Sequence, residues 1–192
     1  MILRRLGFAV CASLVLSTVA WSHTKASSER IARRAALYHR LKEATSITEG
    51  NGPRVLYDFF DPNCPYCHIL YKRLQPLIIR YHLTVHEIPV AYLTPSSAGK
   101  AAALLEAHNP LAALKQSQAH YSWKTGSSIA LKAMTPGTKA KLALNLQLDT
   151  QAAGFPLVPI LVYQKSDGTI RIINSGAPPT WVLKQIAASI KG

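Results

Sequence analysis

The sequence is poor in cysteine and contains no second cysteine pair. Its 192 residues include three cysteines, at positions 11, 64 and 67. A structural zinc site is usually tetrahedral, with a nitrogen or sulfur ligand at every position. No further cysteine pair completes such a site around Cys64 and Cys67, and the histidines at positions 68, 82 and 86 match no closed zinc spacing. We therefore expect neither a bound metal nor another cofactor.

Acidic residues are also scarce. Asp and Glu together number 9, against 22 Lys and Arg, and the formal net charge is +13. Nucleic-acid-binding proteins usually gather their basic residues in one patch or stripe. In this chain the basic residues are spread out, with no dense cluster interleaved with aromatic residues. We therefore expect a solvated basic surface and no nucleic-acid partner.

A third absence is a long apolar run. The apolar segment Leu6–Ala20 follows a pair of arginines and is shorter than the about 20 residues that span a bilayer. A charged start, a short apolar run and a small-x-small site are typical of a secretory signal peptide. We predict a signal peptide over residues 1–22, cleaved after Ser22 or, alternatively, after Ala20, and export to the periplasm.

Export would leave only Cys64 and Cys67 in the mature protein, because Cys11 lies within the predicted signal peptide. These two cysteines can form one internal disulfide, which closes a very small loop and stabilises little. Disulfides form and persist in an oxidising compartment. A pair that contributes so little to stability there indicates a chemical role.

The rest of the pattern predicts an α/β domain, a mixed sheet with helices on both faces. A leading amphipathic helix and linker occupy 23–52, and the domain covers 53–192. The predicted elements are, in order, a helix over 28–47, a strand over 54–61, a helix over 64–81, a strand over 83–93, a helical insertion over 94–150, strands over 160–165 and 169–175, and a helix over 179–192.

The end of the chain carries a hairpin signal and an amphipathic pattern. The last two predicted strands flank Ser166-Asp167-Gly168, which is a turn sequence. In the closing helix, we expect Trp181, Ile186 and Ile190 to enter the core.

The motif Cys64-Pro-Tyr-Cys67 is typical of a dithiol redox site. A thiol must be a thiolate to act as a nucleophile, and the N-terminus of a helix stabilises an anion through unpaired N–H groups and the helix dipole. Cys67 lies one turn further along the same helix, so it can resolve a mixed disulfide formed at Cys64. Pro65 and Tyr66, between the cysteines, would set the redox poise.

Other interpretations of the motif stay open. Cys-Pro-Tyr-Cys-His also fits a c-type haem attachment site, for which Met134 or a histidine is a conceivable second axial ligand. A buried strand before the motif and a hairpin after it argue against a haem pocket. His68 either tunes Cys64 or is merely solvated in the first turn of the helix.

The segment VLYDFFDPNCPYC resembles the active-site segment of thioredoxin-fold proteins. It is most similar to the periplasmic disulfide isomerases of the DsbC/DsbG group, in which DPxCxYCH recurs. VAYLTPSSAGKAAALLEAHNPLAAL resembles the start of the helical insertion of DsbG, and the similarity covers most of 54–190. The resemblance implies a thioredoxin-like fold with a helical insertion between the second strand and the cis-proline loop.

The resemblance also assigns roles to further residues. Asp58 stands where thioredoxin-fold proteins carry a buried acid, which would take the proton of Cys67. Pro159 falls where the family has its cis-proline, so the Val158–Pro159 bond would be cis. The loop around it would offer backbone groups to an extended client segment.

Two departures bear on function. The DsbC/DsbG group carries a separate N-terminal dimerisation domain, which the short leading segment does not supply, so we expect a monomer rather than a dimer. The isomerases typically have Thr before the cis-proline, whereas Val158 is the residue found in the oxidase DsbA.

Together these observations predict an exported thiol:disulfide oxidoreductase that isomerises or reduces disulfides of client proteins. A membrane-bound partner similar to DsbD would recharge it. The alternative within the same chemistry is a DsbA-like oxidase with a DsbB-like partner. Two other hypotheses are a c-type haem electron carrier and a non-catalytic client-binding module.

Overall fold

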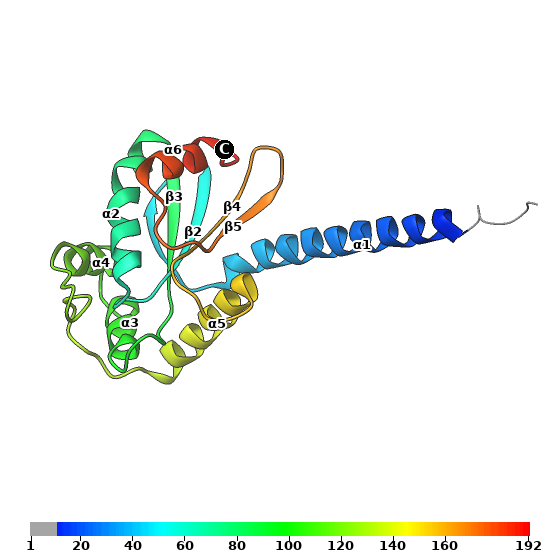
Figure 1. Ribbon diagram of the computed structural model, residues 1–192. Helices are drawn as coiled ribbons and strands as arrows, with labels where there is room; N and C mark the ends of the chain where they lie inside the picture. Colours follow the sequence, from blue (N-terminus) through cyan, green and yellow to red (C-terminus); the bar gives the residue numbers. More distant parts are fainter. Residues whose placement is uncertain (1–10) are drawn as a thin grey trace, which may run out of the picture.

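The computed structural model describes residues 11–192 (Figure 1). The first ten residues of the predicted signal peptide lie outside this range, and its predicted cleavage sites fall within the first helix. No helix in the described part of the chain is long and apolar enough to cross a membrane. The elements are α1 Cys11–Arg40, the short 3₁₀ helix η1 Leu41–Glu43, β1 Ile47–Gly50, β2 Arg54–Phe60, α2 Pro65–Arg80, β3 Leu83–Pro89, α3 Ser97–Leu105, α4 Pro110–Ala119, α5 Pro136–Ala153, β4 Ile160–Gln164, β5 Ile170–Ile173 and α6 Thr180–Ser189.

The strands form one five-stranded mixed sheet in the order β1-β3-β2-β4-β5. The central strands β2 and β3 are parallel and are joined by α2, while the other neighbours are antiparallel. This arrangement confirms the predicted α/β class. β2 and β4 are rich in apolar residues because both of their faces are covered. Leu56 and Phe59 show this, since they lie on opposite faces of β2 and are both fully buried.

Helices cover both faces of the sheet (Figure 1). Leucines of α2 and residues of α6 pack on one face, around Leu56 and Val85. On the other face, α1 and α5 pack around Phe59 and Ile160. The N-terminal part of α1 projects away from the sheet (Figure 1). The site described below lies on the α2 face.

The segment between β3 and β4 contains α3, α4 and α5, in the region predicted as a helical insertion. Its parts go to different places: α4 contacts β1 and α3, whereas α5 contacts α1, β3 and β4. An irregular stretch over 120–135 joins α4 to α5 and is closed by a bridge between Ser122 and Gly126.

The prediction of one helix over 28–47 followed by a linker was wrong at its C-terminal end. The helix ends at Arg40, and residues Ile47–Gly50 form the edge strand β1, antiparallel to β3. Ile47 and Glu49 are buried while their neighbours are exposed. The strand was not predicted because its alternation of apolar and polar residues covers four residues only, directly after a longer helical pattern.

The prediction that Trp181 enters the core was also wrong, because 64% of this residue is exposed. Ile186 and Ile190 are buried as predicted. Trp181 precedes Ile186 by five residues, which places it about 140° away around an α-helix. Leu183 takes the buried position instead.

Two adjacent isoleucines test the orientation of α2, the helix that carries both cysteines. Ile78 is 7% exposed and packs in the core, whereas Ile79 is 84% exposed. We expect Ile78→Ala to lower the free energy of unfolding by about 2–5 kcal/mol, and Ile79→Ala to change it by less than about 0.5 kcal/mol. Urea unfolding measures both. Equal losses in the two variants would contradict this orientation.

Candidate functional site

The two cysteines lie at the N-terminus of α2. Cys64 is the N-cap residue and Pro65 follows at the first helical position. The backbone N–H of Cys67 donates a hydrogen bond to Cys64 Sγ, with an N–S distance of 3.2 Å. Both thiols are free and buried, at 3% and 2% exposure. The sulfur of Cys64 thus takes the place that a serine or aspartate oxygen occupies in an ordinary helix cap.

The surroundings of the two thiols shift their acidities in opposite directions. A hydrogen bond from the Cys67 thiol, together with the backbone N–H groups of Cys67 and Tyr66, lowers the pKa of Cys64, although burial and Asp61 oppose this. Burial, the hydrogen bond to Cys64 and the charges of Cys64 and Asp58 raise the pKa of Cys67 well above its usual value. The two shifts favour the thiolate form at Cys64 and the protonated form at Cys67.

The loop before β4 faces Cys64. The Val158–Pro159 peptide bond is cis, as predicted. The sulfur of Cys64 lies 3.9 Å from the carbonyl oxygen of Val158. Val158 also packs against the apolar cluster that contains both cysteines. The loop and the helix N-terminus thus meet at the reactive sulfur.

Asp58 is buried on β2, as predicted, at 1% exposure. Neither of its carboxyl oxygens accepts from an ordinary donor among the described residues, and its bond with Glu87 requires that one of the two acids is protonated. Burial and the charges of Glu87 and Cys64 raise its pKa well above the usual value. Its charge in turn raises the pKa of Cys67. The structure therefore brings Asp58 within electrostatic reach of the cysteine whose proton it was predicted to take.

The remaining predicted residues differ in their settings. Pro65 and Tyr66 are exposed between the cysteines, and 61% of Tyr66 is accessible. His68 is buried instead of solvated: its ring stacks on Tyr121 at 4.2 Å between centroids, and Nδ1 lies 2.7 Å from Gln118 Oε1. The solvated interpretation of His68 was wrong because residues after α3 cover the first turn of α2.

Two residues that the sequence did not single out hold the loop before Cys64. Asp61 is 1% exposed and accepts hydrogen bonds from the backbone N–H groups of Asn63, Tyr92 and Leu93. The Asn63 side chain bonds to Ser97 and accepts from Lys100 Nζ at 2.7 Å. These contacts link the cysteine loop to the start of the insertion. Their signal in the sequence was the polar run DPN immediately before Cys64.

Gly126 shows how closely the insertion packs on this loop. It has a φ of +75°, and an added Cβ would lie 2.2 Å from Asn63 Oδ1 and 2.7 Å from Asn63 Cα. Only glycine fits both the backbone angle and the space.

Two further acids were missed. Glu87 on β3 stands opposite Asp58 in the parallel register, and Glu49 lies on β1. They are 2% and 5% exposed. The signal for Glu87 was its place in LTVHEIP, where every second residue from Leu83 onward faces the core.

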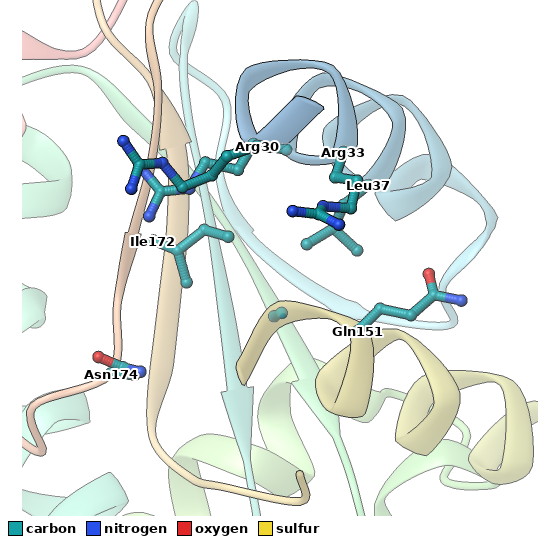
Figure 2. Close-up of a pocket in the computed structure, with 8 residues that line it drawn as sticks. Arg30, Arg33, Leu37, Gln151, Ile172 and Asn174 are labelled. Carbon is teal, nitrogen blue, oxygen red and sulfur yellow. The ribbon is translucent and has the colours of Figure 1, made fainter. Parts of the chain in front are cut away.

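A pocket lies between α1, α5 and the segment around β5, and its lining includes neither cysteine (Figure 2). Its volume is about 230 Å³, and the lining includes Arg30, Arg33, Arg34 and Asn174. The guanidinium groups make it basic, but its lining residues include no cysteine.

In the part of the chain that the structure describes, no group of three or more His, Cys, Asp or Glu residues is placed to hold a metal ion.

Comparison with known proteins agrees with this geometry. A family model of the thioredoxin-like domain matches residues 41–189. The thiol:disulfide interchange protein DsbG of Pseudomonas aeruginosa is 28% identical over 155 residues, which cover 78% of this chain and 58% of that protein. The chain therefore spans less than two thirds of the length of this relative.

Solved structures show the same fold. A linker-deletion mutant of Proteus mirabilis ScsC superposes with a TM-score of 0.66 at 22% identity, covering 96% of this chain and 97% of that one. A periplasmic thioredoxin-like protein from Salmonella enterica serovar Typhimurium gives a TM-score of 0.59 at 21% identity, covering 74% and 87%. The predicted thioredoxin-like fold is confirmed.

Replacing Cys67 tests the source of the acidity of Cys64. Cys67→Ala removes the thiol that donates to Cys64, the largest influence lowering its pKa, so we expect the pKa of Cys64 to rise. The rate of alkylation by iodoacetamide, measured against pH, reports this pKa. The matched variant Cys67→Ser keeps a donor and should raise it less. A pKa that stays the same or falls in Cys67→Ala would contradict the assignment.

Proposed function

The chain belongs to the thioredoxin-like domain family, and on that basis we propose that it is a thiol:disulfide oxidoreductase acting on client proteins through Cys64 and Cys67. The observation that carries the proposal is the geometry of one helical turn, in which Cys64 caps α2 and its sulfur accepts from the backbone N–H of Cys67 at 3.2 Å. The opposite directions of the two thiol pKa shifts agree with it. Such an asymmetry gives one thiolate that attacks the client disulfide and one thiol that stays protonated until it resolves the mixed disulfide.

The reaction begins with the thiolate of Cys64. It attacks a client disulfide, a mixed disulfide forms between Cys64 and the client, and the other client sulfur leaves as a thiolate. Cys67 then loses its proton and attacks Cys64 Sγ. The Cys64–client bond breaks, a Cys64–Cys67 disulfide forms, and the client has gained the electron pair that the dithiol lost. In the reverse direction the same steps oxidise the client.

Asp58 is proposed to accept the proton of Cys67. The carboxyl group is buried beside Glu87, and its raised pKa brings it closer to that of the thiol. A base is most effective when its pKa lies near the working pH. The strand β2 fixes Asp58 under the site, on the same face of the sheet as Phe60, which packs with both cysteines.

The cis-proline loop is proposed to bind an extended client segment. The carbonyl of Val158 lies beside the reactive sulfur, where backbone pairing would hold the client disulfide against Cys64. Exposed aromatic residues stand on the neighbouring segments: Tyr66, Trp123 and Phe155 are 57–67% accessible. Such side chains bind apolar segments of unfolded proteins through contact area rather than sequence.

Isomerisation or reduction is the proposed direction, which places the chain near the DsbC/DsbG group. The similarity to DsbG over 155 residues supports it. An oxidase is the second candidate, because Val158 stands where the isomerases typically have threonine. A c-type haem has no support among the comparisons. Either direction needs a membrane-bound partner to restore the cysteines.

We propose a periplasmic location and removal of residues 1–22, leaving residues 23–192 as a monomer in which β1 at Ile47–Gly50 belongs to the sheet of the domain. The apolar segment at the N-terminus supports this, as does the periplasmic character named for the similar Salmonella protein.

Trapping a client tests the proposed function. Purified residues 23–192 carrying Cys67→Ser should accumulate a disulfide-linked complex with a scrambled disulfide protein, because Cys64 can attack but nothing resolves the bond. Cys64→Ser is the matched variant and should form none. Non-reducing electrophoresis and intact mass measure the complex. Absence of a complex with Cys67→Ser, or equal complexes with both variants, would refute the function.

Wild-type residues 23–192 distinguish isomerisation or reduction of a client from its oxidation. The wild-type dithiol should restore activity to a scrambled client, and its disulfide form should oxidise a reduced client more slowly. Faster oxidation of the reduced client than reactivation of the scrambled client would favour the oxidase.

A further inference from the structure

Three buried carboxyl groups lie on adjacent strands beneath α2. Asp58 on β2 stands opposite Glu87 on β3, and Glu87 stands opposite Ile47 on β1. Side chains alternate along a strand, so Glu49 shares its face with Ile47 and therefore with Glu87 and Asp58. The three acids are 1%, 2% and 5% exposed. Asp58 and Glu87 are direct neighbours across two strands, whereas Glu49 stands opposite Val85 and therefore lies diagonally from Glu87. These three acids, called the row below, begin at Asp58, whose charge acts on Cys67.

This row is costly for the fold. Burying a carboxyl group is unfavourable unless it is hydrogen-bonded. Both oxygens of Asp58 and Oε1 of Glu87 lack an ordinary donor among the described residues, and the hydrogen bond between the two acids requires that one of them is protonated. The equivalent positions one step back along the strands, Leu56 and Val85, are apolar and belong to the core. Buried ionisable groups whose cost is not offset locally are typical of functional sites.

The far end of the row differs from the near end. The carboxylate of Glu49 binds Lys115 Nζ at 2.7 Å and accepts from Gln75 Nε2 at 3.1 Å. The side chain of Lys115 is 52% exposed. Gln75 and Lys115 line a pocket of about 430 Å³, together with Tyr71, His68 and Trp123. The row thus runs from a buried thiol to groups that border an open pocket between α2 and α4.

The charges around the row favour shared protons. Burial and the charge of Glu49 raise the pKa of Glu87 to about 8. Tyr71 faces the same groups from α2, and burial with the charge of Glu49 raises its pKa, so it keeps its proton. Lys115 from α4 supplies the facing positive charge, and Cys64 and Cys67 complete the titratable groups on the α2 side.

A bound client would further limit the contact of Cys67 with water. Cys67 is 2% exposed even in the free protein, and a client held at Cys64 and Val158 would cover the side that faces the cis-proline loop. The pocket beside Gln75 lies on the α4 side of α2.

We propose that Glu87 and Glu49 form a proton path, which takes the Cys67 proton from Asp58 to the pocket lined by Gln75 and Lys115. The path rests on the proposed function, because it serves the step in which Cys67 resolves the mixed disulfide. The proton leaves Cys67 Sγ for Asp58, passes to Glu87 and then to Glu49, and reaches water in the pocket. Cys67 forms the disulfide with Cys64, and the client sulfur leaves as a thiolate.

Stopped-flow kinetics with a peptide disulfide separates the two steps. Attack by Cys64 is second order in peptide, whereas release by Cys67 is first order. In Glu87→Gln and Glu49→Gln, we expect attack to stay within about twofold of wild type and release to slow by about tenfold, below the loss of about a hundredfold expected for Asp58→Asn. Glu43→Gln, at a glutamate whose side chain is 48% exposed, is the control.

The pH profile gives a readout that a structural role would not move. The charge of Glu87 raises the pKa of Asp58, so its removal should shift the midpoint of the release rate to lower pH. Glu87→Asp restores a titratable group and should recover much of the rate. It also keeps the test usable if Glu87→Gln fails to fold, as thermal unfolding will show.

Unchanged release rates and midpoints in both glutamine variants would overturn the path. Equal slowing of attack and release would also overturn it, because the effect would then reach Cys64 as well. Failure of the function itself looks different: wild type would show no attack phase at all, or Cys64→Ser would reduce the peptide equally well.

Discussion

The site depends on one interaction, the cap that Cys64 places on the N-terminus of α2. The hydrogen bond from Cys67 N–H to Cys64 Sγ joins the helix, the reactive sulfur and the second cysteine in a single turn. A helix begins with N–H groups that have no partner in the helix, and an anion there satisfies them. The hydrogen bond from the Cys67 thiol lowers the pKa of Cys64 most, and the N–H contact that starts the helix lowers it further. Burial raises the pKa of Cys67.

The surrounding fold serves to hold this turn in place and to limit its access to water. Asp61 and Asn63 fasten the preceding loop to α3, and Gly126 allows the insertion to pack against Asn63. The cis-proline loop closes the other side at Val158. Because the thiols are enclosed on all these sides, they have little contact with bulk solvent. This burial gives Asp58 and the row behind it their proposed importance.

Local patterns predicted much of this arrangement. The strand over 54–61, the helix after Cys64 and the hairpin around Gly168 were each encoded within a few adjacent residues, so periodicity and turn chemistry were sufficient. The spacing of Cys64 and Cys67 on one helix likewise needed no tertiary information. The cis-proline at Pro159 was predicted from resemblance alone, since it depends on contacts far away in the sequence. The burial of Asp58 was predicted from resemblance together with its apolar and aromatic neighbours on the strand.

What could not be predicted depended on register and packing. Glu87 meets Asp58 only because β2 and β3 pair in one particular parallel register. β1 is stabilised by its pairing with β3 rather than by its four residues. Trp181 had the right composition for a core position, but the sheet meets the other side of α6. His68 is buried by Tyr121, which is more than 50 positions away in the chain.

The central claim, that the two thiols differ in acidity because of one helical turn, is tested most directly by titrating both in the same reduced molecule. Selective ¹³Cβ labelling of cysteine allows nuclear magnetic resonance to follow each thiol separately against pH. The account predicts that Cys64 titrates below the usual pKa of cysteine and that Cys67 titrates well above it. Titration of both at the usual value, or of Cys67 before Cys64, would contradict it.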